Sequence, residues 1–213
     1  MKKKTTLISI GNGGFNIARE IFMSGIFDHP EFFIMDSEEN ELKEKDPIGR
    51  FKTVLLPIFE GEVNSASATE IKDVISSDSE RVVICSTLGG KTGTFYAPLI
   101  AMDSFLKGKE VHTLSSMPFK FEGEKRLKRA EGASSQLYYA SDIFIIQRND
   151  RLSDFNSMKL GDLDVPMVKY YRHLIEGEDF PMRTKALLQD VIEPITFQFP
   201  TLTIEKRMKG FNK

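Results

Sequence analysis

The chain has 213 residues, of which 40% are hydrophobic and 28% charged, and its formal net charge is −2. This balance is ordinary for a globular protein, speaks against a disordered chain, and gives no reason to expect a nucleic-acid partner. No apolar run approaches the roughly 18 residues that a membrane helix needs, and no signal peptide is visible, so we expect a cytoplasmic protein. The single cysteine, Cys85, lies in an apolar run and is expected to be a buried small side chain.

Short apolar runs without polar alternation recur along the first 150 residues. Residues 6–10 are the first, and a helical pattern follows them. Further runs cover residues 32–35, 52–56, 81–85, 110–114 and 142–146, and further helical patterns cover residues 69–75, 98–106 and 122–139. Strands that alternate with helices and are apolar throughout predict an α/β fold. We expect a mostly parallel sheet of about six strands with helices on both faces.

The pattern weakens after residue 149. Residues 163–175 are a candidate helix, in which Pro166 must lie in the first turn or break the helix. Residues 182–192 are a second candidate helix, and residues 195–204 are a candidate strand interrupted by a proline. This tail is expected to be a C-terminal extension or a reduced second domain.

Two glycine clusters each follow a predicted strand and open a predicted helix, at residues 11–16 and 89–94. Glycines let the backbone approach an anion closely, and a helix N-terminus adds unpaired N–H groups and a favourable dipole. A single turn of this kind is common without any ligand, but two at one edge of a parallel sheet indicate a phosphate site. The candidate phosphate-binding residues are Gly11, Asn12, Gly13, Gly14, Gly89, Gly90, Lys91, Thr92, Gly93 and Thr94.

The first cluster also fits part of the dinucleotide-binding fingerprint G-x-G-x-x-G. Gly11 and Gly13 match it, Asn16 replaces the third glycine, and Asp36 ends the second predicted strand. A Rossmann domain that binds NAD(P) therefore stays open as an alternative, although it does not explain the second cluster. The second cluster is not a Walker A loop, because Lys91 lies between the glycine pair and the threonine.

Three segments resemble the FtsZ/tubulin family of GTPases. Residues 87–98, T-L-G-G-K-T-G-T-F-Y-A-P, resemble its signature loop G-G-G-T-G-[ST]-G. Residues 118–126, P-F-K-F-E-G-E-K-R, are similar to its P-F-x-F-E-G-x-x-R, and residues 146–152, I-Q-R-N-D-R-L, resemble its I-P-N-D-x-L. The resemblance covers roughly residues 5–155. It implies a nucleotide-binding domain at 1–155, with the central helix and an extension or reduced second domain at 156–213.

The resemblance also implies a ligand and a role for each matching position. The expected ligand is GTP or GDP, with Mg²⁺ accompanying GTP. The first cluster would wrap the α- and β-phosphates, and the second would bind the terminal phosphates. By the same resemblance, the ribose would be bound by Glu122 and Arg126, and the base by Asn16, Asn149 and either Tyr170 or Tyr171.

Each of these residues has an ordinary structural alternative. Glu122 and Arg126 stand four apart and could simply form a surface pair on a helix. Asn149 lies in a turn signal, and adjacent tyrosines are more often core than a platform for a base. The histidines show no metal-binding spacing with each other or with the cysteine, so we expect no metal site of the protein's own.

The sequence departs from the family at several positions that bear on GTP hydrolysis. Lys91 and Phe95 replace signature glycines; Lys91 could bind phosphate as a charge or obstruct the approach of the backbone. Residues 60–68 hold one glycine where the family has a glycine-rich loop, and the acidic loop N-x-D-x-x-D is not found, residues 189–193 being the nearest stretch. The resemblance implies that head-to-tail self-association is possible, and without the acidic loop GTP hydrolysis would be slow at most. A non-hydrolysing interaction module with a cell-division or filament partner is the alternative.

Overall fold

The computed structural model describes residues 3–57, 78–149, 164–176 and 192–195. Its sheet has the strand order β3-β2-β1-β4-β5-β6-β7. The parallel strands are β1 (Thr5–Ile10), β2 (Glu31–Asp36), β3 (Lys52–Leu55), β4 (Arg81–Thr87), β5 (Glu110–Met117) and β6 (Ile143–Arg148). β7 (Ile192–Ile195) pairs antiparallel with β6 at the edge. The predicted α/β fold with a mostly parallel sheet is confirmed.

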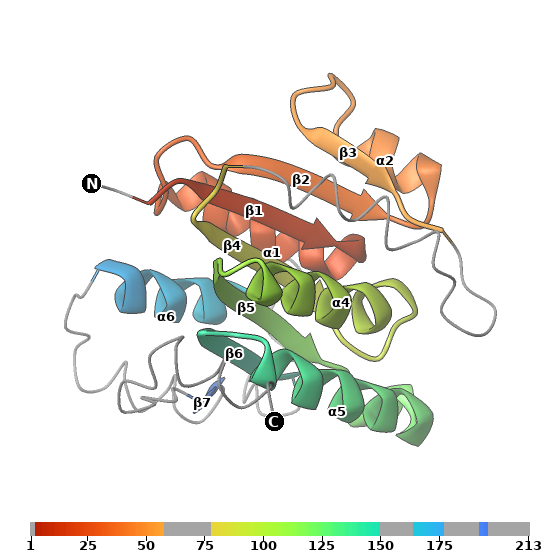
Figure 1. Ribbon diagram of the computed structural model, residues 1–213. Helices are drawn as coiled ribbons and strands as arrows, with labels where there is room; N and C mark the ends of the chain where they lie inside the picture. The colour runs from red at the N-terminus through yellow and green to blue at the C-terminus, as the bar shows by residue number, and fades with distance from the viewer. Residues whose placement is uncertain (1–2, 58–77, 150–163, 177–191, 196–213) are drawn as a thin grey trace.

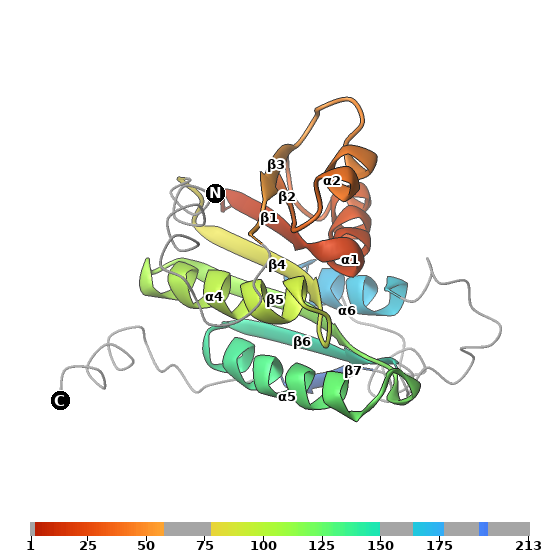
Figure 2. The same cartoon turned by 90° about the vertical axis from the view of Figure 1, so that its right-hand side faces the viewer.

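Helices cover both faces of the sheet (Figures 1 and 2). They are α1 (Gly11–Ser24), α2 (Glu39–Lys45), α4 (Thr92–Leu106), α5 (Glu124–Tyr139) and α6 (Val165–Glu176), with a 3₁₀ turn, η1, at Lys120–Glu122. Figure 2 shows α4 and α5 on one side of the strands and α1 and α6 on the other. No helix in the described part of the chain is both long enough and apolar enough to cross a bilayer.

The core has two halves, one on each face of the sheet, because successive residues of a strand point to opposite faces. Ile8 and Ile84 pack with α4 and α5, whereas Leu7 and Val83 pack with α1 and α6. Both faces are therefore apolar, which explains why the strands read as continuous hydrophobic runs. Cys85 is fully buried, as expected, and burial raises the pKa of its thiol well above the ordinary value.

Several element boundaries differ from the sequence prediction. The helix expected from residue 122 begins at Glu124, because Gly123 has a φ of 100° and separates it from η1. The helix expected from residue 163 begins at Val165, with Pro166 in its first turn. α2 was not expected. β7 begins at Ile192, which was expected to end a helix, and ends at Ile195, which was expected to begin a strand; a proline is tolerated there because β7 is an edge strand. The expected elements at 69–75, 182–191 and 196–204 lie outside the described residues.

Candidate functional site at the carboxyl edge of the sheet

The two glycine clusters meet at the carboxyl edge of the sheet, where α1 and α4 begin (Figure 1). α1 starts directly after β1, and residues 88–91 separate β4 from α4. A Cβ built on Gly11 would lie 3.9 Å from the Cβ of Thr92, so the two clusters are neighbours in space. This edge is where ligands bind in open parallel sheets.

Close packing explains three of the glycines. A Cβ on Gly13 would lie 2.0 Å from the Thr87 methyl carbon, and one on Gly14 would lie 2.4 Å from the carbonyl oxygen of Cys85. A Cβ on Gly93 would lie 2.4 Å from the carbonyl oxygen of Thr87. Both helices therefore begin pressed against the last residues of β4, and a side chain at any of these positions would push them away.

The other two glycines of the second cluster differ from each other. Gly89 has a φ of 91°, and its Cβ would lie 3.0 Å from Pro118 and 3.2 Å from the carbonyl oxygen of Arg126. Glycine at position 89 therefore lets the second cluster pack closely against residues 118–126. Gly90 has open space around it and no left-handed φ, so the fold does not require glycine at this position. Its bare backbone faces a pocket instead.

The N-termini of α1 and α4 are both open to an anion. Neither helix has a capping side chain, and neither has an acidic residue in its first turn. The first N–H groups of a helix have no partner within it, so two sets of donors converge here. Thr92 and Thr94 add hydroxyl groups, which are held by Ser37 Oγ at 2.9 Å and by the N–H of Gly89 at 2.7 Å.

A pocket of about 440 Å³ extends from the second cluster toward the ends of β2 and β3. Its polar lining is Ser37, Glu38, Lys91, Thr92, Thr94 and Arg129. Phe95, Tyr96 and Pro57 form its apolar wall, and the Tyr96 hydroxyl donates a hydrogen bond of 2.7 Å to the carbonyl of Pro57. The volume is within the usual range for small-molecule sites. No motif marks Ser37, Glu38 or Arg129, so the sequence did not predict them as site residues.

Glu122 and Arg126 lie beside the second cluster and pair with each other. The Glu122 carboxylate accepts hydrogen bonds from the Arg126 guanidinium and from the backbone N–H of Phe119, the latter at 2.8 Å. The surface pair considered from the sequence is thus formed. Both groups are partly exposed, with side-chain exposures of 24% and 49%, so a ligand can still reach them. Their contact with ribose stays a prediction.

The four candidate base-binding residues occupy different environments. Asn16 is half-buried on α1, and Asn149 lies just after β6, where its Oδ1 accepts a hydrogen bond from Gln147 Nε2 at 3.1 Å. Tyr170 is partly buried against the core. Tyr171 is 0% exposed, and its hydroxyl is 2.7 Å from His112 Nδ1, near the amino end of β5. We correct the assignment accordingly: Tyr171 belongs to the core and has no face open to a base.

Asp36 is not available to a ribose. Its carboxylate is buried, accepts a hydrogen bond of 2.7 Å from the Ser37 N–H, and forms an ion pair with Lys45. Lys45 comes from α2 and is itself only 6% exposed. Because the Rossmann alternative needs this carboxylate on the cofactor, the ion pair removes its main support.

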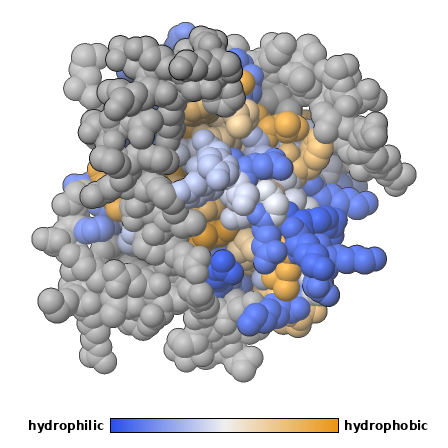
Figure 3. Space-filling view, turned by 60° about the horizontal axis from the view of Figure 1, so that its bottom comes forward, coloured by the Kyte–Doolittle hydropathy of each residue, from blue (hydrophilic) through white to orange (hydrophobic). Residues whose placement is uncertain are grey.

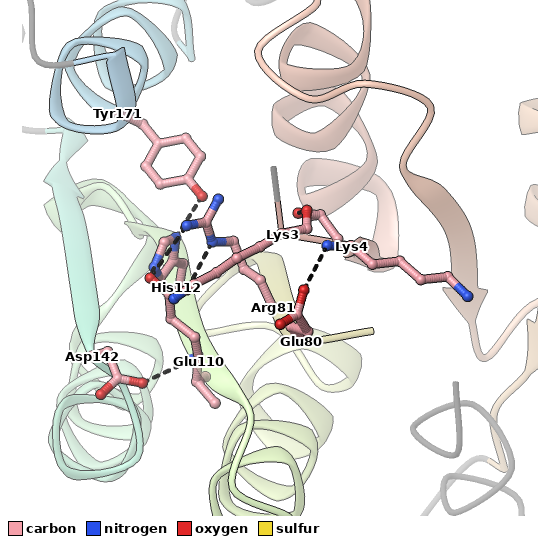
Figure 4. A network of polar contacts seen from close by, with 10 residues as sticks. Lys3, Lys4, Glu80, Arg81, Glu110, His112, Asp142 and Tyr171 are labelled. Atoms are coloured by element: carbon pink, nitrogen blue, oxygen red, sulfur yellow. Dashed lines mark hydrogen bonds and ion pairs between the residues drawn. The ribbon is translucent and has the colours of Figure 1, made fainter. Parts of the chain in front are cut away.

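A second polar network lies at the opposite, amino edge of the sheet (Figure 4). His112 connects Tyr171 of α6 to Glu110, which also pairs with Arg81 and Lys3. Burial lowers the pKa of His112, although its bond to Glu110 acts the other way. Burial would raise the pKa of Glu110, but hydrogen bonds from His112, Lys3 and Arg81 outweigh it and hold that pKa well below its usual range. The network fastens α6 to the sheet, away from the glycine clusters.

Comparisons with known proteins point to the same family as the sequence motifs. The family model for the GTPase domain of the tubulin/FtsZ family matches residues 56–157. The cell division protein FtsZ of Aquifex aeolicus is 29% identical over 167 residues, which cover 74% of this chain and 45% of that protein. FtsZ of Buchnera aphidicola subsp. Baizongia pistaciae is 33% identical over 168 residues, which cover 74% and 43%. The chain thus spans less than half the length of these relatives.

The fold is likewise similar to solved structures of such proteins. An empty FtsZ dimer from M. jannaschii superposes with a TM-score of 0.67 at 23% identity, covering 89% of this chain and 61% of that one. CetZ2 from Haloferax volcanii, in a GTPγS-bound protofilament, gives 0.65 at 20% identity, covering 86% and 62%. The resemblance that the motifs indicated is confirmed.

Proposed function

We propose that this chain, which carries a GTPase domain of the tubulin/FtsZ family, binds a guanine nucleotide at the carboxyl edge of its sheet. One observation carries the proposal: two helix N-termini without caps or first-turn acids lie side by side there. The arrangement concentrates N–H donors and positive dipole ends on one point, which suits a polyphosphate. The glycines that pack against β4 keep both N-termini at this point.

The order of the elements along the sheet predicts where each part of the nucleotide would bind. The α- and β-phosphates would lie over residues 11–14, and the terminal phosphate over Gly90, Thr92 and Thr94. Gly90 supports this placement, because its bare backbone faces the pocket although the fold does not require glycine there. The ribose would lie near Glu122 and Arg126.

The guanine base would lie near Asn16 and Asn149, with Tyr170 as the remaining aromatic candidate. An asparagine amide both donates and accepts hydrogen bonds, which matches the mixed edge of guanine. The hydrogen bond from Gln147 Nε2 to Asn149 Oδ1 orients the Asn149 amide group and thereby its nitrogen as well.

Mg²⁺ would arrive with GTP rather than bind to the protein alone. The described residues contain no group of three histidine, cysteine or acidic side chains that could hold a metal. Glu38 is the one carboxylate among the described residues that line the pocket. A lining with one carboxylate suits a Mg²⁺ ion that phosphate oxygens and water would chiefly hold. Such an ion would neutralise part of the phosphate charge.

We expect slow hydrolysis and head-to-tail self-association as the finer parts of the proposal. Hydrolysis requires a water that is held in line with the terminal phosphate. Glu38 is the one carboxylate among the described residues that line the pocket, and the acidic loop of the family is not found in the sequence, so we expect hydrolysis to be slow. The GTPγS-bound protofilament of CetZ2 is a precedent for assembly in a protein of the same fold.

Calorimetric titration with GTP, GDP and ATP in the presence of Mg²⁺ tests the proposal. We expect micromolar binding of GTP or GDP and much weaker binding of ATP. Phosphate release and sedimentation, measured with the same protein, then test hydrolysis and assembly. Failure to bind any of the three would refute the nucleotide site and favour an interaction module. Saturable binding of NADH would instead support the alternative of a Rossmann domain that binds NAD(P).

A further inference from the structure

Two basic side chains line the pocket next to the expected terminal phosphate. Lys91 belongs to the second glycine cluster and Arg129 to α5, and both line the pocket with Thr92 and Thr94. Both side chains are exposed. In Figure 3, hydrophilic residues gather on the side of the molecule where α5 begins. The pocket is thus reached by two cations that come from different elements.

Lys91 occupies a position that is unfavourable for a cation when nothing is bound. It is the N-cap residue of α4, where the helix dipole is positive and where anions are stabilised instead. No acidic residue lies in the first turn to compensate, and Lys91 forms no ion pair with the described residues. Departures from local preference of this kind are expected at functional sites. A bound anion would turn the repulsion into an attraction.

Arg129, like Lys91, forms no ion pair with the described residues, whereas two neighbouring cations on α5 do. Arg126 pairs with Glu122 and Lys128 pairs with Glu124, in each case an acidic residue four positions earlier. Arg129 has no acidic partner among the described residues, and its Nε donates only to the carbonyl of Lys125, at 3.4 Å. Its guanidinium is therefore free to bind phosphate oxygens, for which its planar donors are well suited.

The position of the pocket indicates which phosphate Lys91 and Arg129 would contact. The pocket is lined by the second cluster and by residues just after β2 and β3, and none of residues 11–14 is among its described lining residues. A nucleotide whose first two phosphates lie at residues 11–14 would direct only its third phosphate into this space. Glu38 is the opposing charge on the wall, and a Mg²⁺ ion on the phosphates would screen it.

We propose that Lys91 and Arg129 are specificity-determining residues that bind the terminal phosphate and make the site prefer a nucleoside triphosphate to a diphosphate. This inference rests on the proposed function, since it assumes that a guanine nucleotide binds at the glycine clusters. It assigns to Lys91 the role of a ligand rather than that of an obstruction. It also assigns Arg129, which no sequence motif marks, to the same site.

The test compares the affinities of GTPγS and GDP, each with Mg²⁺, for wild type, Lys91→Gln, Arg129→Gln and the double variant. We expect each single change to weaken GTPγS binding by about tenfold and GDP binding by less than about threefold, because charge-assisted bonds to one phosphate are lost. Lys128→Gln is the matched control, since Lys128 is also an α5 cation but does not line the pocket. Circular dichroism checks that each variant is folded.

Salt dependence gives a second readout. The wild-type affinity for GTPγS should fall more steeply with added KCl than the affinity for GDP, and the double variant should lose that difference. Unchanged GTPγS affinity in the double variant would overturn the inference, and so would equal weakening of both nucleotides. If wild type binds neither nucleotide, the proposed function itself has failed. If wild type binds both nucleotides and the variants discriminate between them as wild type does, the proposed function stands without this inference.

Discussion

Gly93→Ala and Gly90→Ala make the same chemical change at two positions of one loop, and we expect opposite consequences. At Gly93 the new methyl group would lie 2.4 Å from the carbonyl oxygen of Thr87, and the obstacle is backbone of a central strand. At Gly90 no atom lies within 4 Å of the new methyl group. The first change should therefore damage the fold, and the second should damage only the approach of a ligand.

The magnitudes follow from these two environments. Overpacking of this kind costs about 1–3 kcal/mol, and the gain in helix propensity from glycine to alanine returns up to about 1 kcal/mol. Gly93→Ala should thus lower the free energy of unfolding by about 1–2 kcal/mol, or the melting temperature by roughly 2–8 °C in a chain of this size. Gly90→Ala should change the free energy of unfolding by less than about 0.5 kcal/mol, or raise it slightly, because alanine restricts the unfolded chain.

Urea unfolding and calorimetric titration with GTPγS separate the two effects. Gly90→Ala should keep its unfolding midpoint and bind nucleotide several-fold more weakly, because a methyl group would stand between backbone and phosphate. Thr87→Ser serves as a control for general disturbance of the strand end, since it retains the carbonyl oxygen that Gly93 contacts. A neutral Gly93→Ala, or a Gly90→Ala variant that unfolds early and binds normally, would refute the division of the loop into packing and binding glycines.

Three further predictions concern residues outside this loop. Burial and the nearby charge of Glu20 raise the pKa of Asp164 from 3.8 to about 6, so ionisation of this carboxyl group opposes folding. The free energy of unfolding should therefore fall by up to about 3 kcal/mol as the pH rises from about 4 to above 6. Asp164→Asn should remove this fall, as measured by urea unfolding at each pH. Glu122→Ala and Arg126→Ala should each weaken GDP binding in calorimetry while unfolding midpoints barely move, because an exposed helix pair contributes only a few tenths of a kcal/mol; unchanged affinity in both would remove them from the site. Tyr171→Phe should cost about 1–3 kcal/mol in urea unfolding, because it leaves a buried histidine nitrogen unpartnered, and nucleotide affinity should not change.

The fold could be predicted because its signals are local. Each parallel strand is a continuous apolar run, since both faces of the sheet are covered, and each glycine cluster marks the end of a strand. The motifs at 87–98 and 118–126 are local as well, and by themselves they indicated the resemblance to the FtsZ/tubulin family. The junction of β1 with α1 and the gap between β4 and α4 both fall where the glycines predicted them.

Individual site residues depended on packing that the sequence does not encode locally. Tyr170 and Tyr171 are adjacent and chemically identical, and only the docking of α6 on the sheet decides that Tyr171 is buried against His112. The loss of Asp36 to an ion pair likewise depends on where α2 places Lys45.

The pocket itself could not be foreseen for the same reason. Arg129 reaches it because α5 packs beside α4, so a residue far along the chain comes to line the same space as Lys91. By itself, the sequence determined the periodicity of the elements and the positions where glycine is required, because both are properties of neighbouring residues. Only the tertiary structure decided which side chains share a surface, because that depends on how whole helices pack against the sheet.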